Sequence, residues 1–438
     1  MVSKMSNSSS DLHSHLLRIS EPITELLGRT RCIPQESSNV STKEILLSLL
    51  PNPSSRPSSR DSDTEIHASI RHFVLACALL SSSRSSDHEL LSWIPENLSL
   101  AAESAFREFS SVYFGCFPRK NAEGLGEERR LVIELLPEVL PELKGRIKES
   151  SIGKGTDTDD ISSTMTRTPV GYAILSAYQL RWFVSQVEKP HLGQLCNLVI
   201  PCALTALDHW SHEVKGQGMI CFVHLTKNVT GPELSLYGDV ILDACCQNIV
   251  SADEIWIHVV EMSVLLLTEI QRNNPRSSWF ERILNEMLGH LERQPGNKER
   301  RIAWLRFIEP LFNALGLFLL AHFRRIFPLF FQWMHADDDE TVLLVLEKVE
   351  TVVRLTWIRN SPHITRLVDE LVSLYKESSM RKSREDIRRL ILRVLTLLRE
   401  CKGQQFETAW IKHHEDPNLR IVTQSIQSLH GAMRYETK

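Results

Sequence analysis

Apolar residues recur along this chain at spacings of three and four, the periodicity of a helix that buries one face. Leu367, Leu371 and Leu374 follow this spacing near the C-terminal end. Alternating β-branched runs bounded by Asn-Gly or Asp-Gly turns, the signal of strands and hairpins, do not appear in the sequence. The pattern therefore predicts an all-α fold.

A two-helix unit recurs within this pattern. Residues 195–207 form an apolar stretch that carries Pro201, and a polar turn and a second apolar stretch beginning at Val214 follow it. Residues 323–333 form an equivalent apolar stretch that carries Pro328, and it is also followed by a polar turn and a second apolar stretch. A proline costs about 3 kcal/mol inside a helix unless a kink is wanted. A bent first helix, an acidic turn and a second helix are together typical of HEAT repeats.

The spacing of the units supports this interpretation. Equivalent positions in five successive units are separated by 41, 46, 40 and 43 residues, within the period of about 40–47 of HEAT and armadillo repeats. These positions are Pro201, Leu242, Leu288, Pro328 and Leu371. A weaker sixth unit is expected over 405–429. The sequence predicts a HEAT/armadillo-like helical-repeat solenoid, a right-handed superhelix of antiparallel helix pairs.

Two regions are expected along the chain. Residues 1–125 form an irregular N-terminal helical region, and residues 126–438 form the regular array. Helices are expected in the first region at about 11–28, 42–50, 64–81, 86–92 and 97–115. Two polar segments, a Pro/Ser-rich linker at 51–62 and an insertion at 149–168 between the helices of the first regular pair, are predicted to be disordered.

Composition and charge narrow the classes of partner. The formal net charge is −4, so the chain lacks the strong positive field that would attract nucleic acid or an anionic membrane. The most apolar stretch, 311–331, is interrupted by His322, Arg324 and Arg325, and we expect a buried repeat helix there instead of a membrane span. The polar, Ser-rich start of the sequence does not resemble a secretion signal. A cytoplasmic protein without nucleic-acid or membrane partners is the expectation.

Few residues of the sequence offer candidate chemistry. Gly153 to Thr156 superficially resemble a phosphate-binding loop, but Lys148 stands where the first glycine of that motif belongs. Two groups of polar turn residues could bind a metal ion only weakly, because no second cluster of ligands lies near either in sequence. They are His209, His212 and Glu213, and the run from His413 to Asp416. The run Asp337, Asp338 and Asp339 is more typical of a helix cap than of a cation site.

The nine cysteines indicate buried, reduced thiols. None forms a Cys-x-x-Cys pair, and most lie in apolar helical stretches. Cys245 and Cys246 have no neighbouring base in the sequence to activate them. We expect a protein that is not an enzyme and that holds no metal and no cofactor.

Candidate partner-binding residues lie near the C-terminal end. The segment from Lys376 to Lys402 holds nine Lys or Arg against four Asp or Glu. A solvated helix face is its ordinary interpretation, and a docking surface for an acidic partner segment is the alternative. The basic residues concerned are Arg381, Lys382, Arg384, Arg388 and Arg389. Trp357 with Arg359, at the end of a second helix, is the pair most typical of a protein interface.

Two stretches carry a family resemblance. The first contains Lys215, Gly218, Cys221, His224, Asn228, Val229, Leu234, Tyr237 and the segment from Val240 to Ala244. The second is Thr356-Trp357-Ile358-Arg359. Both resemble motifs of the family of the second Tel-interacting protein, a HEAT-repeat subunit of the Triple T (TTT) co-chaperone complex. The likeness covers about residues 190–380 and leaves the N-terminal quarter unmatched.

The resemblance implies a function that the periodicity does not. It implies a scaffold that binds companion HEAT-repeat subunits and, with the Hsp90 machinery, helps to mature and stabilise phosphatidylinositol-3-kinase-related kinases. A nuclear location beside the cytoplasmic one is also expected. Another HEAT adaptor, a nuclear transport receptor or a phosphatase or microtubule scaffold, is the alternative that the repeat pattern alone fits equally well.

Overall fold

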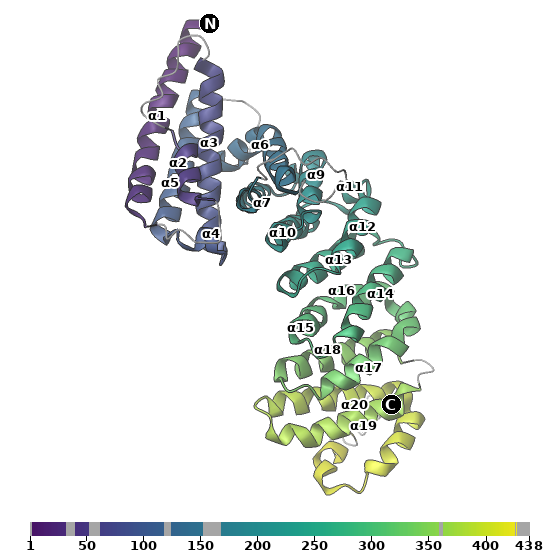
Figure 1. Cartoon of the computed structure of the whole chain (residues 1–438). Coiled ribbons are helices and arrows are strands. Elements are labelled where there is room, and N and C mark those ends of the chain that lie inside the picture. The colour runs from purple at the N-terminus through teal and green to yellow at the C-terminus, as the bar shows by residue number, and fades with distance from the viewer. Residues whose placement is uncertain are drawn as a thin grey trace, which may run out of the picture. The chain divides into compact units, whose positions relative to one another are not determined.

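The computed structural model describes residues 2–31, 40–51, 62–117, 124–151, 168–358, 362–424 and 426. Every regular element in these ranges is a helix (Figure 1). The chain forms two compact units, Met1–Leu234 and Ser235–Lys438. The predicted all-α class is confirmed.

The first unit begins with five helices, each of which overlaps one expected from the sequence, although the first begins nine residues earlier than expected. They are α1 (Val2–Arg29), α2 (Thr42–Leu49), α3 (Ser62–Ser82), α4 (Glu89–Ser92) and α5 (Glu96–Cys116). Helices α1, α3 and α5 pack on one another around a core in which the rings of Phe73 and Phe109 meet edge to face, 5.5 Å between centroids. The expected linker at 51–62 lies almost entirely outside the described residues.

Stacked helix pairs follow in the same unit. The pairs are α6 (Glu127–Ser151) with α7 (Val170–Ser185), and α9 (Cys196–Leu207) with α10 (His212–Asn228), and short helices α8 (His191–Gln194) and α11 (Gly231–Ser235) lie in the connections. Helix α6 packs on α9 and α7 packs on α10, so first helices contact first helices and second contact second. The expected insertion falls mostly on 152–167, outside the described residues. The expected boundary near residue 125 lies inside this unit and stays a prediction.

The second unit has the same two-layer plan. First helices α12 (Gly238–Asn248), α14 (Ser278–Arg293), α17 (Phe323–Met334) and α19 (His363–Glu377) pack in sequence, one on the next. Second helices α13 (Trp256–Ile270), α15 (Lys298–Phe307) with its continuation α16 (Glu309–Leu315), α18 (Asp339–Thr356) and α20 (Arg384–Trp410) form the other layer. Stacked pairs of this kind are the HEAT-like helical-repeat solenoid that the sequence predicts.

Two details of the repeats were also anticipated. Pro201 and Pro328 lie inside α9 and α17, as the repeat alignment requires. Within α20 the backbone of Lys402 leaves the helical region (φ −140°, ψ 33°), so a new helical segment begins there. This segment and the helical residues 420–424 lie where the weaker sixth unit was expected.

One segment, Glu309–Met334, is long and apolar enough to cross a membrane by length and composition alone. In the structure it comprises α16, a 3₁₀ turn (Gly316–His322) and α17, and Gly316 turns the chain with a φ of +50°. Leu311, Phe327 and Phe330 are fully buried against neighbouring repeats. These features are those of core helices in a repeat array, as the sequence predicts.

Candidate functional site: the loop edges of the C-terminal repeats

Ion pairs link consecutive turns of the second unit. Each pair joins charged residues that lie in, or at the helix ends beside, consecutive turns between a first helix and its second helix. The pairs are Asp253 with Arg300, Asp338 with Arg301, Asp339 with Arg381, and Asp416 with Lys376. We call this set the turn ladder. It ties the repeats together along one edge, since each pair joins two different repeats.

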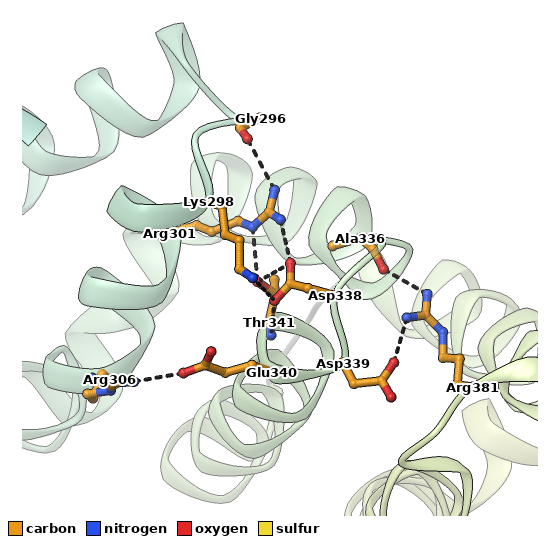
Figure 2. A network of polar contacts seen from close by, with 10 residues as sticks. All are labelled: Gly296, Lys298, Arg301, Arg306, Ala336, Asp338, Asp339, Glu340, Thr341 and Arg381. Carbon is orange, nitrogen blue, oxygen red and sulfur yellow. Dashed lines mark hydrogen bonds and ion pairs between the residues drawn. The ribbon is translucent and has the colours of Figure 1, made fainter.

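Asp338 and Arg301 form the second rung of the turn ladder (Figure 2). Asp338 is also the N-cap of the next helix. Its Oδ1 accepts the backbone N–H of Thr341 at 2.9 Å, which caps the start of α18, and its Oδ2 lies 2.6 Å from Nη2 of Arg301. Burial acts to raise the pKa of Asp338, but the hydrogen bonds from Thr341 and Arg301 outweigh it, so the pKa is lowered. The capping role predicted for this acidic run is confirmed at Asp338.

The next rung joins Asp339 to Arg381. Arg381 Nη1 lies 3.1 Å from Asp339 Oδ1, and Nη2 donates to the carbonyl of Ala336 at 2.7 Å (Figure 2). The backbone N–H of Ser383 donates to the second oxygen of Asp339 and, with Arg381, lowers the pKa of that carboxyl. Only 14% of the Arg381 side chain is exposed, so this guanidinium is engaged within the chain.

The other basic residues of this region differ in their surroundings. Arg384 and Arg389 are exposed and pair with acidic neighbours on their own helix. Arg388 lies over the ring of Tyr375 and donates to Ser378 Oγ, and Lys382 is exposed. The five basic residues therefore do not form one uniform ridge, and their role in docking stays a prediction.

Trp357 has an unusual backbone. It ends α18 in the left-handed conformation (φ 52°, ψ 20°), and Ile358 also has a positive φ of 42°. Glycine usually occupies such a position, and a side chain there costs about 1–2 kcal/mol. The turn places Ile358 fully in the core and leaves 62% of Trp357 exposed. Arg359, its expected companion, lies outside the described residues.

Most other tryptophans of the C-terminal half belong to the core. Trp256, Trp304 and Trp333 are fully buried, and Trp410 is buried as well. Exposure therefore distinguishes Trp357 from these four, although its role at an interface stays a prediction.

A histidine cluster that sequence reasoning missed lies beside the turn ladder. His335, at the end of α17, lies 2.8 Å from a carboxylate oxygen of Glu377 and 2.9 Å from one of Glu370, both on α19. Burial acts to lower the pKa of His335, but the bonds to Glu377 and Glu370 outweigh it, so the pKa is raised. The sequence signal was available: these residues are 42 and 35 apart, near one repeat period.

The residues considered for metal binding serve structural contacts. His209 is fully buried, its Nδ1 accepts the N–H of Ser211 at 3.0 Å and its Nε2 lies 2.8 Å from Ser150 Oγ, and burial lowers its pKa. His212 pairs with Glu213 at 3.1 Å. Among the residues that the structure describes, no group of three His, Cys, Asp or Glu side chains is placed to hold a metal ion.

The thiols of the paired cysteines are also buried. Burial raises the pKa of Cys245 to about 12 and raises that of Cys246 as well. A thiol in this state is a poor nucleophile. The loop from Gly153 to Thr156 lies outside the described residues.

The residues of the first family motif hold α10 in place. A Cβ on Gly218 would lie 2.9 Å from Ala206 Cβ and 3.1 Å from the carbonyl of Ala203, so glycine allows α9 to approach closely. Cys221 is buried, and His224 Nε2 lies 2.8 Å from the carbonyl of Val187. The shared motif is therefore largely a packing motif.

Stacked helix pairs joined by a ladder of charges define a HEAT-like repeat protein, and a solved structure agrees in fold. The solved structure of Kap95p with RanGDP superposes with a TM-score of 0.50 at 9% identity, over 84% of this chain and 45% of that one. At this identity the likeness shows the fold alone, and the chain spans less than half of Kap95p. No model of a known protein family matches the chain.

Two relatives are similar in sequence, and the first of them shows the family. The chain is 70% identical over 426 residues to the uncharacterized protein At2g39910 of Arabidopsis thaliana, a match that covers 97% of this chain and 96% of the relative. The chain belongs to the family of that protein. It is also 24% identical over 206 residues to TELO2-interacting protein 2 of Homo sapiens, which covers 44% of this chain and 40% of the human protein. The resemblance to the family of the second Tel-interacting protein is thus supported as a likeness over part of the chain.

Proposed function

We propose that this protein is a non-enzymatic scaffold, a subunit of a TTT-like co-chaperone complex. In this role it binds companion HEAT-repeat subunits and, with the Hsp90 machinery, helps to mature and stabilise phosphatidylinositol-3-kinase-related kinases. Its proposed location is the cytoplasm, with the nucleus as a second compartment. The HEAT-like fold makes a scaffold or adaptor the coarse class, and the complex is the finer proposal.

The similarity to TELO2-interacting protein 2 is the observation that carries the proposal. The name of that human protein states that it interacts with TELO2, and a protein of similar sequence is expected to bind the TELO2 counterpart. The motif around Gly218 supports a common repeat framework, because its residues set how α10 packs on α9.

The surroundings of the candidate chemical groups support the non-enzymatic part. The Cys245 thiol is buried and has a high pKa, and the buried imidazole of His209 is engaged by the Ser150 hydroxyl and the Ser211 N–H. Catalysis needs a nucleophile or base that a substrate can reach.

Affinity purification of the full-length protein, tagged at its own locus, tests the proposal. We expect recovery of the TELO2 counterpart, a third HEAT-repeat subunit, Hsp90 and at least one large kinase of this class. An unrelated HEAT-repeat protein expressed at the same level serves as the control bait. Recovery of Ran with import cargo, of a phosphatase or of tubulin, without the TELO2 counterpart, would contradict it.

Depletion gives an independent measurement. Removing a maturation scaffold should shorten the half-life of newly made kinases of this class while their mRNA stays constant. Unchanged kinase half-lives after complete depletion would argue against the maturation role even where the complex is recovered.

A further inference from the structure

Two loops of the second unit expose apolar side chains on the edge opposite the turn ladder. These loops join a second helix to the first helix of the next repeat. Leu317 and Phe318, after α16, are 46% and 44% exposed, and Trp357, after α18, is 62% exposed. Because repeats stack in register, successive loops of this kind follow the same edge. The 3₁₀ turn that carries Leu317 and Phe318 packs on α18, the helix that Trp357 ends.

Basic side chains accompany these apolar ones. The Arg276 guanidinium lies over the ring of Phe318, 5.6 Å from its centroid. Arg354 lies three residues before Trp357, about one helical turn away. Arg393, on α20, shares with Arg354 the carboxylate of Glu350, and its Nη2 lies 2.7 Å from Glu350 Oε1. We call Arg276, Leu317, Phe318, Arg354, Trp357 and Arg393 the aromatic edge.

The charge of the aromatic edge is unbalanced. Arg354 and Arg393 are 64% and 55% exposed, whereas their shared partner Glu350 is only 9% exposed. Within the described part of the chain, no carboxylate lies within ion-pair distance of Arg276. Three guanidiniums thus face solvent against one largely buried carboxylate, which favours an anionic ligand.

The turn ladder offers a contrast. Its guanidiniums, such as Arg301 and Arg381, are mostly buried and are matched by carboxylates of the neighbouring repeat. That edge also exposes apolar side chains, such as Val250 and Met380, but these two are aliphatic and have no aromatic neighbour beside them in sequence. An exposed indole among arginines is, by comparison, the composition of a binding hot spot.

We propose that the aromatic edge binds an acidic segment of a partner protein, with one apolar side chain of that segment packed on Trp357. The partner's carboxylates would pair with Arg276, Arg354 and Arg393. Such a contact deepens the proposed scaffold function. The proposal rests on that function only where it expects the partner to belong to a TTT-like complex.

A photo-crosslinker tests the occupant directly. We would place benzoylphenylalanine at position 357 of the full-length protein in cells, with position 380 as the matched control. Position 357 should crosslink to a segment rich in Asp and Glu that contains a large apolar residue. Absence of a crosslink, or a crosslink to a basic or uncharged segment, would overturn the proposal.

The crosslinked segment, made as a labelled peptide, then serves as the probe. Trp357→Ala should weaken its binding at least tenfold, as should Arg276→Glu with Arg354→Glu, and Met380→Ala should change it less than twofold. Circular dichroism and the Tm check that each variant is folded. Because exposed charges are screened, raising the salt from 0.05 to 0.5 M should also weaken binding. Equal affinities for the wild type and Trp357→Ala would refute the inference.

The two proposals fail separately. An acidic crosslinked segment from a protein outside a TTT-like complex would uphold the aromatic edge and contradict the proposed function. Recovery of the complex with no acidic crosslink at position 357 would uphold the proposed function and contradict the aromatic edge.

Discussion

Removing the carboxylate of Asp338 should destabilise α18 far more than removing that of its neighbour Asp337. Asp338→Ala deletes the N-cap, worth about 1 kcal/mol. It also leaves Arg301, whose side chain is only 11% exposed, without the carboxylate 2.6 Å away. Breaking a fully buried pair costs about 3–5 kcal/mol and an exposed one about 0–1. Asp338 is 17% exposed, so a cost of about 2 kcal/mol lies between these limits.

The total expected loss for Asp338→Ala is therefore about 3 kcal/mol in the local opening of α18. Since about 1.4 kcal/mol corresponds to a factor of ten, backbone amides of this helix should exchange with solvent about a hundred times faster. Asp337 is exposed, and Asp337→Ala should change stability by less than about 0.5 kcal/mol. Asp339→Ala removes one ion pair and the acceptor of the Ser383 N–H, without loss of a cap, and should fall between the two.

Hydrogen exchange of the full-length protein, followed by mass spectrometry of peptides from α18, measures the effect. Peptides of the first unit serve as the internal control. Similar exchange for the variants at 337 and 338 would refute the assignment of Asp338 as cap and rung. The folded pKa of Asp338 is lowered, so its stabilisation is present above about pH 4 and is lost as the pH falls through that folded pKa. The difference between the wild type and Asp338→Ala should shrink accordingly below pH 4.

Three further predictions concern other contacts. The pKa of His335 is raised, so its bonds to Glu370 and Glu377 stabilise the fold below about pH 6.5 and are lost as the pH rises through the folded pKa. Urea denaturation should therefore show that His335→Gln costs about 1 kcal/mol of stability at pH 6 and close to none at pH 9. Gly218→Ala should lower the Tm because overpacking against α9 costs about 1–3 kcal/mol. Gly145→Ala, whose new Cβ meets no atom within 4 Å, should raise the Tm, and a rise for both variants would contradict the close approach of α9 and α10. Cys245, with its pKa near 12, should resist iodoacetamide at pH 8 in the native protein, and labelling as fast as that of the half-buried Cys116 would refute its burial.

The sequence predicted the helices well because their signal is local. Each helix buries one apolar stripe, and the spacing of three and four along 363–377 reports that stripe directly. The prolines at 201 and 328 marked equivalent first helices, and the structure places both inside helices. The repeat period then determined which helices pair.

The turn ladder was less visible, although the sequence contains its signal. Arg301 and Asp338 are 37 residues apart, and Asp339 and Arg381 are 42 apart, each close to one repeat period. Opposite charges separated by one period therefore predict rungs between neighbouring turns. Without that rule the sequence groups Arg381 with the exposed basic residues, whereas its guanidinium lies between two turns.

The exposure of Trp357 could not be read from the sequence. Four other tryptophans of the C-terminal half are buried, so residue type alone gives no distinction. What exposes Trp357 is the pair of positive φ angles that turns Ile358 into the core. A left-handed turn at Trp-Ile is unfavourable for both residues, so only the packing of the finished repeats determines it.

Substitutions on the two loop edges of the second unit should consequently affect stability and partner affinity differently. On the turn ladder, side chains are satisfied by the neighbouring repeat, so loss of Asp338 or Arg301 would weaken partner binding only as far as it loosens the repeats. On the aromatic edge, Trp357 and Arg276 contribute little to packing, so their loss can reduce affinity without lowering the Tm. Measuring affinity and Tm on the same variants therefore separates a framework residue from a contact residue. A loss of affinity at Trp357 that merely followed a loss of stability would assign the indole to the framework.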